Sequence, residues 1–148
     1  MDKLPVSVVV TTRNSEKTIE NCLESIKKNN PGEIILVDGN STDTTLEIAR
    51  RYTSLIFSDE GREYNYAQQL GAEKGVNKYI AFIDSDIVLP DRTLAKLLDE
   101  LIKRDYATIA ATVLPVSSAS YWERATDWNG RLLRERRGVG GLQATIVL

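Results

Sequence analysis

YIAFIDSDIVLP, which runs from Tyr79 to Pro90, is an apolar segment interrupted by two carboxylates one residue apart. Its first five residues are typical of a buried strand. Aspartate is a poor strand former and is almost never fully buried without a partner. The stretch therefore predicts a strand over residues 79–83 that carries Asp84 and Asp86 to the edge of a sheet, where their charge has a use.

Short apolar runs alternate with amphipathic segments along the rest of the chain. The run Val6–Val10 is continuous and β-branched, which favours a strand buried on both faces. Further strands are predicted at residues 34–37, 55–57 and 108–114, with a last strand-like run at 144–148. Four helices are predicted between them. The apolar residues of the first are Ile19, Cys22, Leu23 and Ile26, and those of the second are Leu46, Ile48 and Ala49. The third is predicted at residues 64–74, and the fourth has Leu94, Leu97, Leu98 and Leu101 on one face. This alternation indicates an α/β fold with a mostly parallel sheet and right-handed crossovers.

Capping and turn residues mark the ends of these helices. Ser15 is a candidate N-cap of the first helix, and Asn29–Gly32 would stop it. Either Ser41 or Asp43 can cap the second helix, and Pro90–Asp91 opens the fourth. Each helix is thereby placed between two strands.

Composition restricts the possible functions. The chain has 148 residues, enough for about one domain, and 19 Lys and Arg against 21 Asp and Glu give a net charge of −2, so bulk charge does not favour nucleic acid. The absence of His excludes histidine triads and zinc sites that use His. With the single Cys22 and no apolar run near the roughly 18 residues of a membrane span, we expect a cytoplasmic protein, with peripheral membrane attachment left open.

Polar residues follow three of the predicted strands. These are Thr11–Asn14, Asp38–Ser41 and Asp84–Asp86. Ligands of open parallel sheets bind outside the carboxyl ends of the strands, so the three segments are expected to meet at one edge. Carboxylate oxygens suit a divalent cation that grips a diphosphate. The alternative is that Asp84–Asp86 is only a solvated turn before a helix that starts at Asp91.

Three blocks in this order resemble the nucleotide-sugar-binding half of family-two glycosyltransferases of the GT-A fold. They are VVVTTRNSEKTIENCLESI, IILVDGNSTDTT and GREYNYAQQLGAEKGVNKYIAFIDSD. The resemblance covers residues 4–115. It implies a Rossmann-like, mostly parallel sheet flanked by helices, with a nucleotide-sugar-binding subdomain at residues 1–115. Residues 116–148 would begin an acceptor-side region that is incomplete, as if truncated at the C-terminal side.

The resemblance also implies roles for residues of the first two blocks. Thr11, Arg13 and Asn14 would line the nucleoside pocket, and Asp38 would accept a hydrogen bond from the base. Arg13 replaces the commoner aromatic residue and would either stack on the base or form a local salt bridge. Ser41–Asp43 matches a segment whose expected task is to cap the second helix.

The third block adds residues for the sugar, the diphosphate and a metal. By the resemblance, Asp86 would be the main metal ligand, Asp84 would contact the ribose or the metal, and Ser85 would be a spacer in the nucleotide-sugar site. Arg62 would lie near the nucleotide, unless it is an ordinary surface arginine. Three helix and turn positions are also compared with the family: Gly71 matches a site of close packing, Gln69 replaces Asn, and Asn77 replaces a turn glycine. Asn tolerates the left-handed conformation better than most residues, so the turn into the strand at residues 79–83 is expected to survive.

The function implied is a glycosyltransferase of the hexosyltransferase class that depends on Mg²⁺ or Mn²⁺ and inverts the anomeric centre. Its partners would be a nucleoside-diphosphate sugar and an unidentified saccharide, lipid-linked or protein acceptor. The alternative is a non-catalytic nucleotide-sugar-binding or interaction module, or a fragment. No catalytic base is nominated, because Glu123, Asp127 and Glu135 are expected to be solvated charges on a helix over residues 121–137, where Arg131–Arg137 would also be an exposed face.

Overall fold

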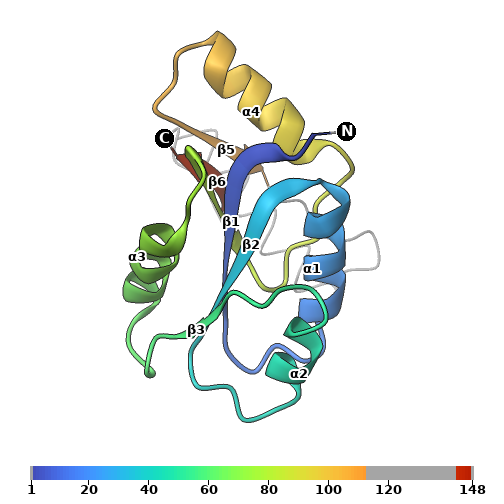
Figure 1. The fold of residues 1–148 in the computed structure, drawn as a ribbon, viewed down its shortest axis with the longest axis vertical. Helices are drawn as coiled ribbons and strands as arrows, with labels where there is room; N and C mark the ends of the chain where they lie inside the picture. Colours follow the sequence, from blue (N-terminus) through green and yellow to red (C-terminus); the bar gives the residue numbers. More distant parts are fainter. Residues whose placement is uncertain (1, 113–142, 148) are drawn as a thin grey trace, which may run out of the picture.

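The computed structural model describes residues 2–112 and 143–147, which form a six-stranded sheet with helices on both faces (Figure 1). The strand order is β3-β2-β1-β4-β6-β5. The elements are β1 (Leu4–Thr12), α1 (Ile19–Lys28), β2 (Pro31–Asp38), α2 (Thr45–Ala49), β3 (Ile56–Ser58), α3 (Tyr64–Lys74), β4 (Tyr79–Asp84), α4 (Thr93–Lys103), β5 (Thr108–Thr112) and β6 (Gln143–Val147). The predicted α/β class is confirmed.

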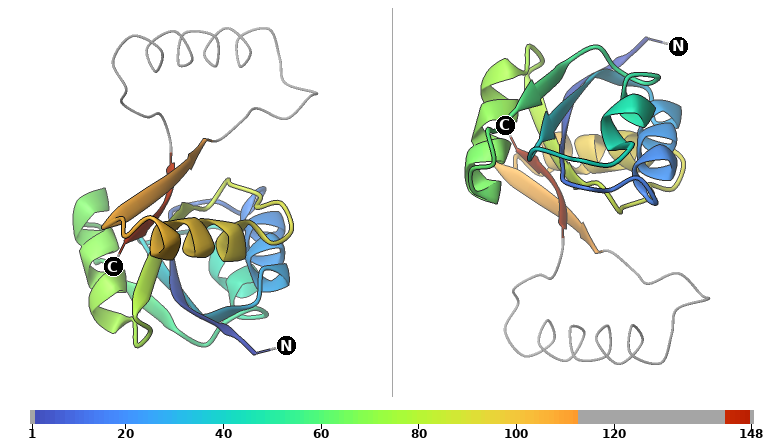
Figure 2. Two further views of the ribbon diagram at one scale, coloured as in Figure 1. Left: turned by 90° about the horizontal axis from the view of Figure 1, so that it is seen from above. Right: turned by 90° about the horizontal axis from the view of Figure 1, so that it is seen from below.

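Three layers build the molecule, with α3 on one face of the sheet and α1, α2 and α4 on the other (Figure 2). Alternate residues of β1 serve the two faces, as the pleat requires. Val8 packs in the larger core with Leu23 of α1 and Leu94 of α4, whereas Val9 packs in the smaller core with Ala67 of α3. The prediction that β1 is buried on both faces is confirmed. Among the described helices, none is both long and apolar enough to cross a membrane.

The sheet is mostly parallel, as predicted. β1 pairs in parallel with β2 and β4, and β2 pairs in parallel with β3. β6 is antiparallel to both β4 and β5 and separates them. β5 therefore runs in the same direction as β4 without being its neighbour. Its predicted last residues, 113 and 114, lie outside the described residues.

α1 ends at Lys28 with Asn29 as its C-cap, so the predicted stop at Asn29–Gly32 is confirmed. Pro31 and Gly32 already belong to β2, where Pro31 occupies the first strand position and needs no ladder donor. The prediction for the start of α1 was wrong. Ser15 is not the N-cap, because α1 begins at Ile19 after Thr18. The Ser15 carbonyl instead accepts from Thr18 N at 3.0 Å and from Ile19 N at 2.9 Å, which makes a turn before the helix.

The N-cap of α2 is Thr44, so neither Ser41 nor Asp43 is the N-cap, although Asp43 lies directly before it. Asp43 accepts from Thr45 N at 3.0 Å and from Glu16 N at 3.2 Å, so it holds the first turn of α2 to the loop after β1. Ser41 is turned to Asp38 instead.

α4 begins two residues later than Pro90–Asp91 suggested, after a left-handed Arg92 with φ 63°.

The close packing expected at Gly71 is confirmed, and the turn at Asn77 leads into β4 as predicted, although without a left-handed conformation. A Cβ at Gly71 would overlap Val9 and lie 3.2 Å from Val37 Cγ2, so α3 rests directly on β1 and β2. Asn77 is not among the described residues with positive φ. Its backbone N and its Nδ2 each donate to Ser7 Oγ at 3.1 Å. Asn77 therefore serves the turn through side-chain hydrogen bonds rather than through a left-handed backbone.

Candidate functional site

A row of three residues crosses the carboxyl ends of the central strands. Thr11 of β1 stands opposite Val37 of β2 on one side and opposite Asp84 of β4 on the other. Val9 and Val37 pack towards α3, and residues two apart share a face of a strand, so Thr11 and Asp84 also belong to the α3 face. The strand pairing thus brings Asp84 beside Thr11, as the sequence predicted for the strand ends.

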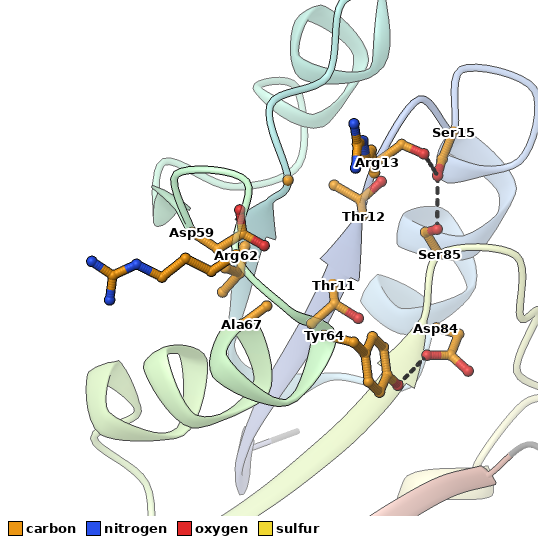
Figure 3. A pocket seen from close by; sticks show the side chains of 12 residues that line it. Thr11, Thr12, Arg13, Ser15, Asp59, Arg62, Tyr64, Ala67, Asp84 and Ser85 are labelled. Atoms are coloured by element: carbon orange, nitrogen blue, oxygen red, sulfur yellow. Dashed lines mark hydrogen bonds between the residues drawn. The ribbon is translucent and has the colours of Figure 1, made fainter.

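A cleft of about 330 Å³ lies above this row, between the strand ends and the start of α3 (Figure 3). Its volume is at the lower end of the range for small-molecule sites. It is lined by Thr11, Thr12, Arg13, Ser15, Val37, Gly39, Asp59, Arg62, Tyr64, Ala67, Asp84 and Ser85. The cleft is therefore built from the ends of β1, β2, β3 and β4 together with α3.

Five of the eight residues predicted for the site line this cleft, and three do not. Those that line it are Thr11, Arg13, Arg62, Asp84 and Ser85; Asn14, Asp38 and Asp86 are not among the lining residues. Asn14 adopts a left-handed conformation with φ 49° and accepts from Thr42 N at 2.8 Å, so its side chain holds the loop after β2. The ligand contacts assigned to all eight stay predictions.

Asp84 is half-buried and has one oxygen committed to a hydrogen bond. Tyr64 Oη donates to Asp84 Oδ1 at 2.6 Å, as Figure 3 shows. No residue of the described chain donates to Asp84 Oδ2. Burial, followed by the hydrogen bond to Asp84 and the charge of that carboxylate, raises the pKa of Tyr64 to about 12. The phenol is therefore neutral at pH 7 and acts as a donor.

Asp86 is exposed in the turn that follows β4, which Ile87 N closes by donating to Asp84 O at 3.1 Å. Beneath this turn the buried Cys22 thiol donates to the same carbonyl at 3.5 Å. Burial, and then the charges of Asp86 and Asp84, raise the pKa of Cys22 to about 12. Both carboxylates also raise the pKa of Tyr64, so their charges act together at this end of the cleft.

These two carboxylates fit a hard divalent cation that is shared with a bound phosphate. Within residues 2–112 and 143–147, no group of three or more His, Cys, Asp or Glu side chains is placed to hold a metal alone. Mg²⁺ is commonly bound through one or two carboxylates together with substrate phosphates and water. The free Asp84 Oδ2 and the exposed Asp86 match that donor set.

Asp38 reaches the predicted edge but faces the other side of the sheet. Residues two apart in a strand share a face, so Asp38 lies on the same face of β2 as Leu36, which packs in the core with α1 and α4. Val37 lies on the opposite face and packs towards α3. Its carboxylate is buried, with Oδ1 accepting from Ser41 Oγ at 2.6 Å and Oδ2 from Ser41 N at 2.9 Å. Both oxygens of Asp38 are therefore engaged within the loop after β2.

The two predicted arginines differ in their surroundings. Arg13 packs its aliphatic stem over Gly39, where an added Cβ would lie 3.4 Å from Arg13 Cβ, and it forms no salt bridge within the described chain. Arg62 pairs with Glu60 at 3.5 Å and lies over the Tyr66 ring at 4.5 Å. Figure 3 shows the Arg62 guanidinium directed away from Asp84. Among the described residues, the local salt bridge that was one alternative for Arg13 is not formed, whereas Arg62 forms one with Glu60.

Ser85 was predicted as a spacer, but it joins two segments of the site. Ser15 Oγ and Ser85 Oγ are 2.8 Å apart and share a hydrogen bond. Ser15 Oγ also lies 3.3 Å from the Arg13 carbonyl oxygen. The loop after β1 is thereby tied to the turn that carries Asp84 and Asp86.

Comparison with known proteins agrees with this geometry. The family described as glycosyl transferase family 2 matches residues 7–146, which is most of the chain. The chain belongs to glycosyl transferase family 2. Among curated family 2 relatives, the low-salt glycan biosynthesis hexosyltransferase Agl6 of Haloferax volcanii is 34% identical over 99 residues, covering 64% of this chain and 24% of Agl6. The putative glycosyltransferase EpsH of Bacillus subtilis is 32% identical over 93 residues, covering 58% and 27%. The chain thus spans about a quarter of the length of these relatives.

Solved structures share the fold of this family 2 chain. S. aureus TarS in complex with UDP-GlcNAc superposes with a TM-score of 0.66 at 24% identity, covering 81% of this chain and 36% of TarS. The glucosyl-3-phosphoglycerate synthase of Mycobacterium tuberculosis, in complex with Mn²⁺ and UDP-glucose, gives 0.63 at 23% identity, covering 96% and 55%. The GT-A fold is therefore confirmed.

Asp59 and Tyr64 line the cleft and were not predicted from the sequence. Asp59 follows β3 and is only 5% exposed; its Oδ1 accepts from Gly61 N at 2.7 Å, and no described residue donates to its Oδ2. The strand-end rule that pointed to Asp38 could have found it. Tyr64 gave no such signal, because a helix residue meets Asp84 only through the packing of α3 on the sheet.

Proposed function

We propose that this chain provides the donor-binding part of a glycosyltransferase that takes a sugar from a nucleoside diphosphate and transfers it to an acceptor hydroxyl. One observation carries the proposal: the row from Val37 through Thr11 to Asp84 forms the floor of a cleft, and Asp86 lies in the turn that directly follows Asp84. Membership of family 2 supports it, as do relatives named as glycosyltransferases and the UDP-sugar complexes of the structural neighbours. In this proposal residues 1–115 are the nucleotide-sugar-binding subdomain.

The donor would lie along the cleft with its base away from the carboxylate pair. Arg13, Gly39 and Asp59 surround that end, where Gly39 lets a ring approach the backbone and Asp59 Oδ2 accepts an N–H of the base. A buried carboxylate without a cationic partner favours a base with an N–H at its recognition edge, such as uracil, thymine or guanine. Asp38 and Asn14 also hold the loop after β2, through Ser41 and Thr42 respectively, and their predicted contacts with the nucleoside are kept beside that of Asp59.

The diphosphate would lie at the other end, near Asp84 and Asp86. Asp86 would be the main ligand of Mg²⁺ or Mn²⁺, and Asp84 Oδ2 would contact the same cation or the ribose. When bound there, the cation neutralises the charge that develops on the departing diphosphate. Ser85 would hold the turn in place through its bond to Ser15.

In the transfer step the acceptor oxygen bonds to the anomeric carbon as the bond from that carbon to the diphosphate oxygen breaks. We propose that this occurs by direct displacement, which inverts the anomeric centre. The acceptor proton would pass to a carboxylate that we do not nominate. Glu123, Asp127, Glu135 and the arginines from Arg131 to Arg137 lie outside the described residues, as does the predicted acceptor-side region up to residue 142.

The proposal is tested by calorimetry with UDP, GDP and dTDP sugars, each with and without Mn²⁺. One of these donors should bind more tightly with the metal. Asp86→Ala should weaken that metal-dependent binding by at least about tenfold, since even indirect partners of a metal are worth about 10–100-fold. Asp91→Ala, which removes an exposed carboxylate beyond the turn, is the matched control and should bind as the wild type does.

Two results would count against the proposal. The metal-dependent site is refuted if no donor binds better with Mn²⁺ and Asp86→Ala changes nothing. Tight donor binding without sugar transfer or donor hydrolysis, even by a longer protein that includes this chain, would instead favour a non-catalytic nucleotide-sugar-binding module.

A further inference from the structure

Tyr64 lies at the start of α3 and reaches with its hydroxyl to the end of β4 (Figure 3). Its Oη donates to Asp84 Oδ1 at 2.6 Å, and Gln68 Nε2, one helical turn further along α3, donates to the same Oη at 2.9 Å. A phenol has one proton to give. Because Gln68 occupies the acceptor side of the oxygen, the proton of Tyr64 is directed at Asp84.

The hydrogen bond from Tyr64 takes up Oδ1 of Asp84. No residue of the described chain donates to Oδ2, so this second oxygen is the one left for a ligand.

Packing gives little reason for a tyrosine at this position. Tyr64 is 52% exposed, and the core contact of this part of α3 is made by Ala67, which packs with Val9 and Val37. The feature that distinguishes Tyr64 from a phenylalanine is the single oxygen in contact with Asp84.

We propose that Tyr64 is a positioning residue that fixes the orientation of Asp84, so that Oδ2 faces the cation and diphosphate end of the cleft. This inference rests on the proposed function. Tyr64 acts on the metal only through Asp84, in the way that hydrogen-bond partners of metal ligands set ligand direction and metal affinity.

The test uses Tyr64→Phe, which removes the oxygen and keeps the ring. Tyr66→Phe is the matched control, because Tyr66 is on the same helix, is 37% exposed and has its ring under Arg62 rather than against Asp84. UDP binding to the full 148-residue chain is measured by calorimetry across a series of Mn²⁺ concentrations and in EDTA. In Tyr64→Phe the Mn²⁺ concentration for half-maximal enhancement should rise by about tenfold. Its metal-free UDP affinity, and both values for Tyr66→Phe, should match those of the wild type.

A double variant shows whether the effect passes through Asp84. In an Asp84→Asn background, Tyr64→Phe should add no further loss, since coupled residues are not additive. Should Tyr64→Phe fail to fold, Gln68→Ala releases the phenol from its second bond and should raise the same Mn²⁺ concentration by a smaller factor.

Three outcomes separate the two proposals. If the Mn²⁺ concentration for half-maximal enhancement is the same in Tyr64→Phe as in the wild type, the role of Tyr64 is overturned but the proposed function is not. If Tyr64→Phe does not fold, an unchanged value in Gln68→Ala has the same meaning. A loss of UDP affinity that is equal with and without metal also overturns it. A wild-type chain in which Mn²⁺ enhances the binding of none of UDP, GDP and dTDP overturns the proposed function, and the role of Tyr64 with it.

Discussion

Gly71 controls how closely α3 approaches the sheet, and its replacement by alanine should loosen that contact. A Cβ at this position would overlap Val9 Cγ1 and lie 3.1 Å from Val9 Cγ2 and 3.2 Å from Val37 Cγ2. Val9 is 1% exposed in a central strand, and its β-branched side chain is restricted at χ1. Neither partner can move aside, so α3 itself has to shift.

The size of the effect follows from two opposed contributions. Overpacking a core by one methyl group costs about 1–3 kcal/mol. Alanine regains about 1 kcal/mol of helix propensity over glycine. The overlap with Val9 places the cost in the upper part of its range, so Gly71→Ala should lower the free energy of unfolding by about 1–2 kcal/mol. The corresponding fall in Tm is roughly 2–8 °C for a chain of this size.

Urea denaturation and thermal unfolding followed by circular dichroism measure this change. Gln69→Ala, at an exposed position of the same helix, is the control and should stay within about 0.5 kcal/mol of the wild type. The reasoning is refuted if Gly71→Ala is as stable as the wild type or more stable, because helix propensity would then outweigh the contact with Val9. Because Tyr64 is on the same helix, the shift should also weaken metal-dependent UDP binding.

Two further predictions concern carboxylate recognition of the base and the buried thiol. Asp59→Asn should weaken uridine binding by about tenfold or more, since hydrogen bonds to charged groups contribute about 1.5–3 kcal/mol. Glu60→Gln, at the next residue, is the control and should have no effect. Equal uridine affinities of Asp59→Asn and the wild type in calorimetry would exclude Asp59 from the base site. Cys22 should resist iodoacetamide in the native protein near pH ~8 and react once urea unfolds the chain, because burial raises its pKa to about 12 and only the thiolate reacts. Rapid labelling of the native protein, measured by mass spectrometry, would show that the turn carrying Asp84 opens readily.

α3 links the fold to the candidate site. Its Gly71 sets the distance to β1 and β2, and its first residue, Tyr64, contacts Asp84 at the end of β4. A change that moves this helix should therefore affect the carboxylate pair even when it lies far from the cleft.

The sequence alone determined the order and type of the elements, and the strand ends that meet. Continuous β-branched runs such as Val6–Val10 and the amphipathic periodicity between them are local properties, so they predict strands and helices without tertiary information. The same is true of the apolar run that ends at Asp84, because polar residues at the end of a strand lie at the edge of the sheet.

Only the tertiary structure decided which side of that edge each side chain faces. Asp38 and Asp84 both end strands, but strand parity turns Asp38 towards Ser41 and Asp84 towards α3. Which face carries which helix depends on crossovers between segments far apart in the sequence. The contact between Tyr64 and Asp84, the burial of Asp59 and the position of β6 between β4 and β5 arise from the same long-range packing, which no local pattern encodes.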